Sequence, residues 1–342
     1  MRSLATIQKI SDIRPIEGAD AVELALIKGW QCVVKKGEFN KGDLCVYFEV
    51  DSFLPIDARY EFLRRTSYRN NEYMGEGFRI KTMTMRGELS QGLALPISKF
   101  PEAEPEPGSD ITELLGVRKW ELPESVSSAG VEIGSKPFGI PTTDETRLQS
   151  MTEFLEAFNG LPYYITTKMD GTSCTVYCYD GKVGVCGRNF EYKEDIATCA
   201  MWAWVYKHGI KDKLLKLGEN IAVQGEFCGA GIQKNRLKLM EPNLYVFDVA
   251  ILYGSGGKKA GLAELRAYCE RLGMDMAPVE ETGDCFNYTL EDLLEKARGK
   301  YQSGLDKEGI VVRTQQAGHN NTINHKMSFK VINNDFLKKE KD

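Results

Sequence analysis

The sharpest chemical feature of the sequence is a lysine, Lys168, followed closely by Asp170 and Gly171. Apolar and β-branched runs at 163–167 and 175–179 predict that this lysine lies at a turn between two strands. A glycine in such a turn lets a ligand approach the backbone, and a lysine there is a candidate nucleophile once it has lost its proton. Alone, this pattern is weak evidence for a catalytic lysine, because an exposed lysine in an ordinary polar turn can have the same sequence.

Other charged residues lie at the ends of predicted strands or inside them. Glu226 ends an apolar run and Glu308 precedes another, while Arg188 follows a third. Lys326 and Lys330 are spaced by four residues near the end of the chain. Taken singly, each carboxylate or arginine fits an ordinary salt bridge, and each lysine fits a solvated edge strand.

The order of these segments along the chain is more specific than any one of them. They are KMDG at 168–171, GRN at 187–189, QGEFCG at 224–229, YVFDV at 245–249, KEGIVVR at 307–313 and HKMSFK at 325–330. In this order they resemble motifs I, Ia, III, IIIa, IV and V of the covalent nucleotidyltransferase superfamily of polynucleotide ligases and RNA capping enzymes.

Within that superfamily the chain looks most like the fifth family of ATP-dependent RNA ligases. Those ligases carry an OB-fold domain before the nucleotidyltransferase domain, and the N-terminal strands, the segment RGELSQGLALPI and the segment PTTDETRLQS are similar to that group. The resemblance covers nearly the whole chain. It implies ATP as a substrate, Mg²⁺ or Mn²⁺ as a cofactor and RNA as a partner.

The resemblance gives Lys168 the central role. It implies that Lys168 attacks the α-phosphorus of ATP and passes AMP to an RNA 5′-phosphate, after which a 3′-OH displaces AMP. An ammonium cannot attack, so we expect burial beside Lys326, Lys330 and a metal ion to lower the pKa of Lys168. The family's lysine pair, spaced KxK, reads Ser328-Phe329-Lys330 here. Lys330 is therefore the match, and Lys326, on the same strand face, is expected to replace the missing lysine.

Three carboxylates are brought to one pocket by the motif pattern: Asp170, Glu226 and Glu308. Close together they would repel and raise one another's pKa, so a divalent cation or its water shell is their natural partner. The resemblance implies that they hold Mg²⁺ or Mn²⁺ largely through its waters.

Three further residues are assigned by resemblance. Phe247 is implied to stack on the adenine, although its alternation with apolar neighbours alone predicts a core residue. Arg147 and Arg188 resemble positions that contact RNA termini or phosphates, and Arg188 is also expected at the nucleotide. The planar fork of arginine suits phosphate oxygens, whereas a surface salt bridge is the ordinary alternative.

The elements that must position these residues fall into two parts. Short strand-like runs separated by Gly, Asp and Asn fill residues 1–121 and predict an OB-fold β-barrel. Six of the twelve prolines lie between 101 and 141, which places a connector at 122–140. Residues 141–342 alternate strands with helices, so the chain is expected to be α+β. The resemblance implies that this second part is a nucleotidyltransferase domain, ATP-grasp-like, with antiparallel sheets flanked by helices.

Helical periodicity marks four segments of the second part, and basic residues mark the first. The helices are predicted at 151–158, 195–207, 262–272 and 290–297, the last capped by Thr289. In the barrel, cations are interleaved with aromatic residues, a pattern that fits RNA binding or a solvated face over an ordinary core. These residues are Arg64, Arg65, Arg69, Arg79, Lys81, Arg86, Tyr60, Tyr68, Tyr73 and Phe78.

Composition limits the remaining possibilities. Forty-four Lys and Arg against 49 Asp and Glu give a net charge of −5 over 342 residues, so RNA binding requires a local basic track. No apolar run is long enough for a membrane span or a secretory signal, and we expect a cytoplasmic monomer. The nine cysteines show no CxxC spacing and are expected to be free and mostly buried.

The sequence therefore favours an ATP-dependent RNA ligase that seals 3′-OH/5′-phosphate breaks in nicked duplex or broken RNA, in RNA repair. A DNA ligase or a capping guanylyltransferase is an alternative, but both place the OB domain after motif V, where only about a dozen residues follow here. A non-enzymatic nucleic-acid-binding protein is a third alternative, disfavoured by intact Lys168, Glu226 and Glu308.

Overall fold

The computed structural model describes residues 2–121, 130–137, 139–254 and 256–339. The chain divides into two compact units, one formed by Met1–Glu124 with Leu337–Asp342 and the other by Ser125–Phe336. Both contain more strands than helices, and the strand pairs of the described residues are antiparallel except for β13 with β25. The α+β class expected from the sequence is confirmed.

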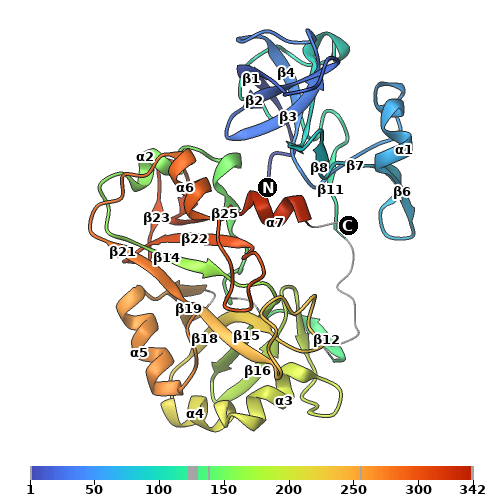
Figure 1. Cartoon of the computed structure of the whole chain (residues 1–342). Coiled ribbons are helices and arrows are strands. Elements are labelled where there is room, and N and C mark those ends of the chain that lie inside the picture. The colour runs from blue at the N-terminus through green and yellow to red at the C-terminus, as the bar shows by residue number, and fades with distance from the viewer. Residues whose placement is uncertain (1, 122–129, 138, 255, 340–342) are drawn as a thin grey trace. The chain divides into compact units, whose positions relative to one another are not determined.

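The first unit is built from short antiparallel strands (Figure 1). One sheet has the order β10 (Leu93–Pro96), β4 (Leu44–Phe48), β1 (Ala5–Pro15), β2 (Val22–Ile27) and β3 (Trp30–Lys35). A second has the order β11 (Arg118–Lys119), β5 (Ser52–Leu54), β7 (Gly75–Arg79) and β6 (Tyr68–Asn71). The other elements are β8 (Thr82–Met85), β9 (Glu88–Gln91), η1 (Ala58–Leu63), α1 (Arg64–Ser67) and η2 (Ile97–Lys99).

The aromatic residues of this unit serve mainly its core. Tyr60 and Phe78 are completely buried, and Tyr68 packs edge-on against Phe78. Tyr73, by contrast, is 61% exposed. The interleaving of aromatics with cations in the sequence thus largely reflects core packing, and Tyr73 is the most exposed of the four rings.

The second unit contains two larger sheets. The seven-stranded sheet has the order β12 (Glu132–Ser135), β17 (Phe190–Tyr192), β16 (Lys182–Cys186), β15 (Thr172–Tyr179), β18 (Ile221–Cys228), β19 (Asn243–Tyr253) and β20 (Gly256–Lys259). The five-stranded sheet has the order β13 (Thr146–Arg147), β25 (Ser328–Ile332), β22 (Gly309–Thr314), β14 (Tyr163–Lys168) and β21 (Val279–Gly283), and β23 (His319–Asn320) pairs with β24 (His325–Lys326). Part of the expected connector, the strand β12, is thus an edge of the larger sheet.

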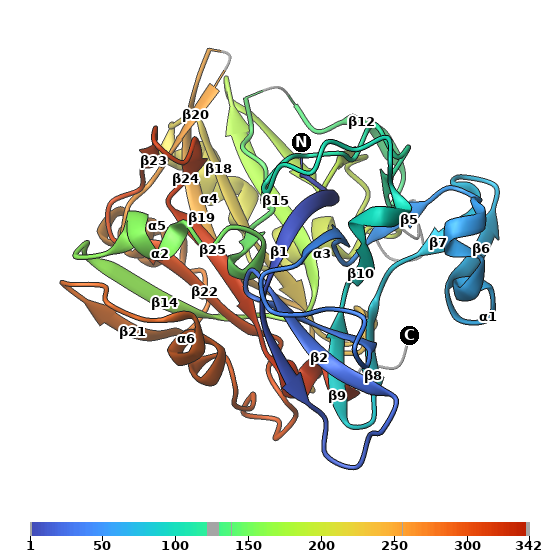
Figure 2. The same cartoon turned by 90° about the horizontal axis from the view of Figure 1, so that it is seen from above.

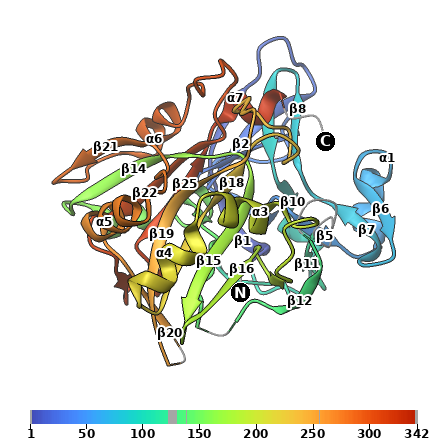
Figure 3. The ribbon, with the colours of Figure 1, turned by 90° about the horizontal axis from the view of Figure 1, so that it is seen from below.

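Helices cover both sheets. The helices α3 (Ala200–Lys207), α4 (Ile210–Leu217) and α5 (Leu262–Leu272) share one apolar cluster with the seven-stranded sheet, and α3 and α4 cross β15 and β18 in Figure 3. The helices α2 (Phe154–Phe158) and α6 (Leu290–Lys296) pack on the five-stranded sheet; the remaining helices are η3 (Leu148–Ser150) and α7 (Asn334–Lys339).

The predicted helices are largely confirmed. Thr289 caps α6 as expected, because its hydroxyl accepts from the Asp292 N–H at 3.2 Å. The helix α4 was missed in the sequence, since Gly209, in a left-handed conformation, separates it from α3. None of the helices in the described ranges is long and apolar enough to span a membrane. All nine cysteines are free, and eight are buried.

The strands β14 and β22 lie side by side (Figure 2). Their register puts Lys168 opposite Gly309 and therefore next to Glu308. Tyr163 and Ile165 point into the core on one side of β14, so Tyr164, Thr166 and Lys168 lie on the other. Gly309 also packs tightly against β25, since a Cβ there would lie 2.1 Å from the Val331 carbonyl oxygen.

We predict that Gly309→Ala destabilises the protein by about 2 kcal/mol or more, because the methyl group must displace β25 and φ at this position is +150°. Gly134→Ala, in the edge strand β12 with no atom within 4 Å of the added Cβ, is the control and should change stability little. Denaturant unfolding measures both. Equal stability of the two variants would contradict this account of the ladder.

Candidate active site

The site centres on an ion pair between residues 140 positions apart. Lys168 Nζ donates to Glu308 Oε2 at 2.7 Å, and each side chain is only 21% exposed. Lys168 reaches this position from the end of β14, and Glu308 from the residue before β22. The carboxylates of Glu226, on β18, and Asp170, two residues after Lys168, also act on the ammonium. The structure therefore brings together four of the residues singled out in the sequence.

The expected direction of the Lys168 pKa is wrong for this state of the protein. Burial alone would lower it, but the carboxylates of Glu308, Glu226 and Asp170 together raise the pKa of Lys168 above its ordinary value. Negative charges surround the ammonium more closely than the expected cations do. The raised pKa favours the charged form of Lys168.

The carboxylate cluster fits a divalent cation. Burial raises the pKa of Glu226 to about 7; Lys168 acts against this shift, whereas Glu308 and Asp170 add to it. Asp170 also lies 3.4 Å from the Arg236 guanidinium. Within the described ranges no three acidic, histidine or cysteine side chains converge closely enough to be direct ligands. That Asp170, Glu226 and Glu308 hold the cation largely through its waters stays a prediction.

Lys330 lies beside the nucleophile candidate. It is on β25, opposite Arg147 of β13 and Val311 of β22 in the strand register. Burial, then repulsion from Lys168 and Arg147, lowers the pKa of Lys330 to about 8. Lys330 and Arg147 thus add positive charge next to the Lys168 cluster. The contact of Arg147 with RNA termini or phosphates stays a prediction.

Lys326 belongs to a neighbouring network. Its ammonium pairs with Glu145 at 3.0 Å and donates to the Asp144 carbonyl oxygen. Glu145 also accepts from Ser328 at 2.6 Å and pairs with Arg313 at 3.2 Å. Burial opposes the charge of Glu145, but Lys326 and Arg313 lower its pKa to about 2. The structure does not show Lys326 against Lys168, so its role as the substitute motif V lysine stays a prediction.

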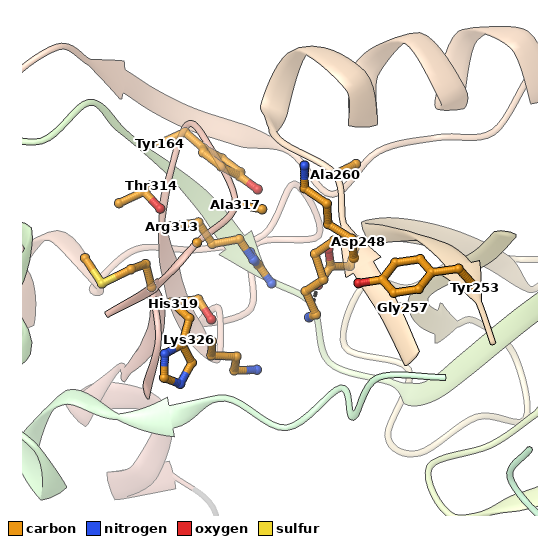
Figure 4. A pocket seen from close by; sticks show the side chains of 15 residues that line it. Tyr164, Asp248, Tyr253, Gly257, Ala260, Arg313, Thr314, Ala317, His319 and Lys326 are labelled. Carbon is orange, nitrogen blue, oxygen red and sulfur yellow. Dashed lines mark hydrogen bonds and ion pairs between the residues drawn. The ribbon is translucent and has the colours of Figure 1, made fainter. Parts of the chain in front are cut away.

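This network borders a pocket of about 310 Å³ (Figure 4). Arg313 and Asp248 lie at its centre and Lys326 at one side, with Tyr164 and Tyr253 among the other lining residues. Because Tyr164 and Lys168 occupy one face of β14, the pocket and the lysine cluster lie along the same face of the five-stranded sheet.

Phe247 occupies a β-bulge. Gln224 pairs with Asp248 and Gly225 pairs with Val246, which leaves Phe247 as the extra residue of β19. Its ring is half-buried beside Met169, and the Arg313 guanidinium carbon lies 5.7 Å from the ring centroid. The bulge explains why strict alternation, which predicted a core residue, does not fully bury this ring.

Arg188 lies at the exposed edge of the site. Its guanidinium donates to the Asp144 carboxylate at 2.8 Å, and its side chain is 42% exposed. Asp144 also acts on Lys330 and bonds to Lys326 through its carbonyl. The segment 144–147 therefore links Arg188, Lys330 and Lys326, which the sequence could not show.

Sequence reasoning gave no role to Glu145 or Arg313. The two side chains are both 8% exposed and pair across 168 positions. A lone cation at the end of the apolar run GIVV was a visible signal for Arg313. Nothing in the sequence identified Glu145 as its partner.

The Lys330 pKa predicts a pH dependence of stability. Because the folded pKa of about 8 lies below the ordinary 10.5, the unfolded chain binds a proton between these values that the folded chain has released. The free energy of unfolding of the natural protein, relative to Lys330→Met, should therefore rise from pH 8 to pH 10.5. Denaturant titrations of both proteins measure this difference. A difference that stays flat or falls with pH would refute the buried, cation-repelled position of Lys330.

Two family models match the chain. A model described as an OB-fold domain matches residues 4–97, and a model described as RNA ligase matches residues 161–332. A search of curated proteins gave no match.

Solved structures of an RNA ligase from Naegleria gruberi are similar over almost the whole chain. The structure with PPi is 37% identical, covers 99% of each chain and has a TM-score of 0.86. A lysine-to-methionine variant with AMP and Mn is 37% identical, covers 100% of each chain and has a TM-score of 0.88. A glutamate-to-alanine variant with ATP and Mn is 37% identical over 100% of each chain, with a TM-score of 0.87. The chain belongs to the RNA ligase family and carries an OB-fold domain ahead of its ligase domain.

Proposed function

We propose that the protein is an ATP-dependent RNA ligase that joins 3′-OH and 5′-phosphate ends, in nicked duplex or broken RNA, through a lysyl-AMP on Lys168. The observation that carries the proposal is the lysine of β14 held among Asp170, Glu226 and Glu308, with Lys330 alongside. The similar ligase from Naegleria gruberi has been solved with ATP and Mn, AMP and Mn, and PPi. This favours the proposal over a DNA ligase, a capping enzyme or a non-enzymatic binding protein.

The chemistry assigned to each side chain follows from its surroundings. Lys168 attacks the α-phosphorus of ATP in line with the leaving pyrophosphate, which splits one difficult displacement into two easier ones. Lys330 is proposed to place positive charge where the α-phosphate gains negative charge in the transition state. Arg147, opposite Lys330 in the strand register, is proposed to contact RNA termini or phosphates. A divalent cation, Mg²⁺ or Mn²⁺, supplies the charge that offsets Asp170, Glu226 and Glu308. With those carboxylates offset, the Lys168 ammonium can lose its proton.

The half-buried ring of Phe247 is proposed to stack on the adenine, and Arg188 to contact the nucleotide and RNA phosphates. Lys326, which is paired with Glu145, is proposed to take the place of the missing motif V lysine. We also propose a role for each part of the chain. Residues 1–121 form the domain that binds RNA, residues 122–140 connect the two domains, and residues 141–342 form the domain that catalyses ligation. The protein is proposed to act in RNA repair as a cytoplasmic monomer.

Substitution of the nucleophile gives the first test. Lys168→Ala should abolish transfer of label from α-labelled ATP to the protein, and Lys168→Arg should be equally inactive because arginine cannot deprotonate. The natural protein should be labelled by ATP and by neither GTP nor labelled NAD, and should seal nicked RNA. Label on either variant would place the nucleophile elsewhere.

Substitution of the carboxylates tests the cation. Glu226→Ala and Glu308→Ala should slow adenylylation by about a hundredfold or more, with the shortfall depending on the concentration of Mg²⁺ or Mn²⁺. Glu219→Ala, which removes a half-buried carboxylate bonded to Arg271 and Tyr268, is the control. If either variant matches the natural protein at every metal concentration, its residue does not serve the cation.

The RNA role of the first unit is tested on its exposed side chains. Arg65→Ala combined with Tyr73→Ala should weaken RNA sealing several-fold and leave adenylylation intact, because phosphate and stacking contacts act only when RNA is bound. Arg14→Ala, 61% exposed in the same unit, is the matched control. Sealing that equals the control at all salt concentrations would remove these residues from the RNA surface.

A further inference from the structure

The hydroxyl of Tyr301 joins the backbones of the two central residues. It donates to the Lys168 carbonyl oxygen at 2.7 Å and accepts from the Glu308 N–H at 3.0 Å. Tyr301 is only 8% exposed, and burial raises the pKa of its hydroxyl well above the ordinary value, so the group stays a donor. These bonds lie where the β14–β22 ladder stops, since its last register pair is Lys168 with Gly309. The hydroxyl therefore continues the ladder beyond its end.

Tyr301 is itself held by a tight turn. Its N–H donates to the Leu305 carbonyl at 2.8 Å, and the Gly304 N–H donates to the Tyr301 carbonyl at 2.9 Å. Gly304 has a φ of +83°, which a glycine adopts without strain. The backbone that carries the Tyr301 side chain is thus held by bonds within its own loop.

Glu280 forms a second link, between the residues that precede Lys168 and Glu308. Glu280 on β21 accepts from the Thr167 hydroxyl at 2.8 Å, and both its oxygens lie 2.7 Å from Lys307 Nζ. The Lys307 side chain is 8% exposed, so this charge-assisted contact is largely shielded from water. Thr167 and Lys307 directly precede Lys168 and Glu308, so Glu280 and Tyr301 fix the same pair of chain segments.

We propose that Tyr301 is a positioning residue for adenylylation, assisted by Glu280, and that it sets the placement of Lys168 against Glu308 through the backbone. Neither residue is assigned a contact with ATP. Their effect is on the geometry of attack, where a misplacement of about 1 Å can cost on the order of a hundredfold in rate. The inference rests on the proposed role of Lys168 as nucleophile.

The test compares two tyrosines in single-turnover adenylylation of the full chain. Tyr301→Phe should lower the rate constant at saturating ATP by roughly tenfold or more, with the ATP concentration for half-maximal rate changed less than about twofold. Tyr288→Phe, which removes a hydroxyl bonded to Glu281 at 2.6 Å, is the control and should keep the natural rate. Unfolding midpoints measured for both variants confirm that the rates refer to folded protein. A Tyr301→Phe rate equal to the control, or a defect that excess ATP removes, would overturn the proposal.

If Tyr301→Phe does not fold, a second pair of variants decides. Thr167→Val removes the hydroxyl that bonds Glu280, and Thr167→Ser keeps one. The valine variant should be several-fold slower than the serine variant at saturating ATP, and equal rates would overturn the proposal. Lys168→Ala, assayed in parallel, distinguishes failure of the proposed function from failure of the positioning role. An adduct on that variant contradicts the proposed function, whereas an inactive Lys168→Ala beside a fully active Tyr301→Phe contradicts only the positioning role.

Discussion

The arrangement of the site follows from the cost of holding one buried ammonium among three carboxylates. Lys168 and Glu308 form a direct ion pair at 2.7 Å, with Glu226 and Asp170 close enough to act on the same charge. Burial is the largest cause that raises the pKa of Glu226, and Glu308 and Asp170 raise it further, whereas Lys168 lowers it. Arg236 lies 3.4 Å from Asp170, and Lys330 adds positive charge nearby. Removing charges from water is unfavourable unless they are balanced, so the cluster favours the entry of further positive charge.

The fold provides the means of building this cluster from distant parts of the chain. The β14–β22 ladder supplies the register that places Lys168 beside Glu308, and β18 in the other sheet supplies Glu226. The short strand β13 adds Arg147 beside Lys330, while Glu145 just before it ties Lys326 to Arg313. The Lys168–Glu308, Arg147–Lys330 and Glu145–Arg313 links each join segments more than a hundred residues apart. Small changes in strand register would therefore separate the charged groups.

Much of this was predictable, for identifiable reasons. Lys168 and Asp170 lie at a turn between two clearly apolar strands, and Thr289 caps its helix, because such signals are local. The convergence of Glu226, Glu308 and Lys330 on Lys168 was expected from motif order. The β-bulge at Phe247 could not be predicted from the local sequence pattern, because it depends on how β18 pairs with β19.

Long-range pairs explain most of what was missed. Glu145 with Arg313 and Tyr301 with Lys168 join residues 168 and 133 positions apart, and neither pair has a sequence signature. The direction of the Lys168 pKa was misjudged because the cations could be counted in the sequence, whereas the nearness of the carboxylates depends on the fold.

The central claim is that Lys168, and none of the other lysines near it, forms the covalent bond to AMP. Peptide mapping by mass spectrometry of the natural protein after incubation with ATP and Mn²⁺ tests it most directly. The account predicts a single AMP adduct, on the peptide that contains Lys168. An adduct on Lys326, Lys330 or Lys307, with Lys168 unmodified, would contradict it.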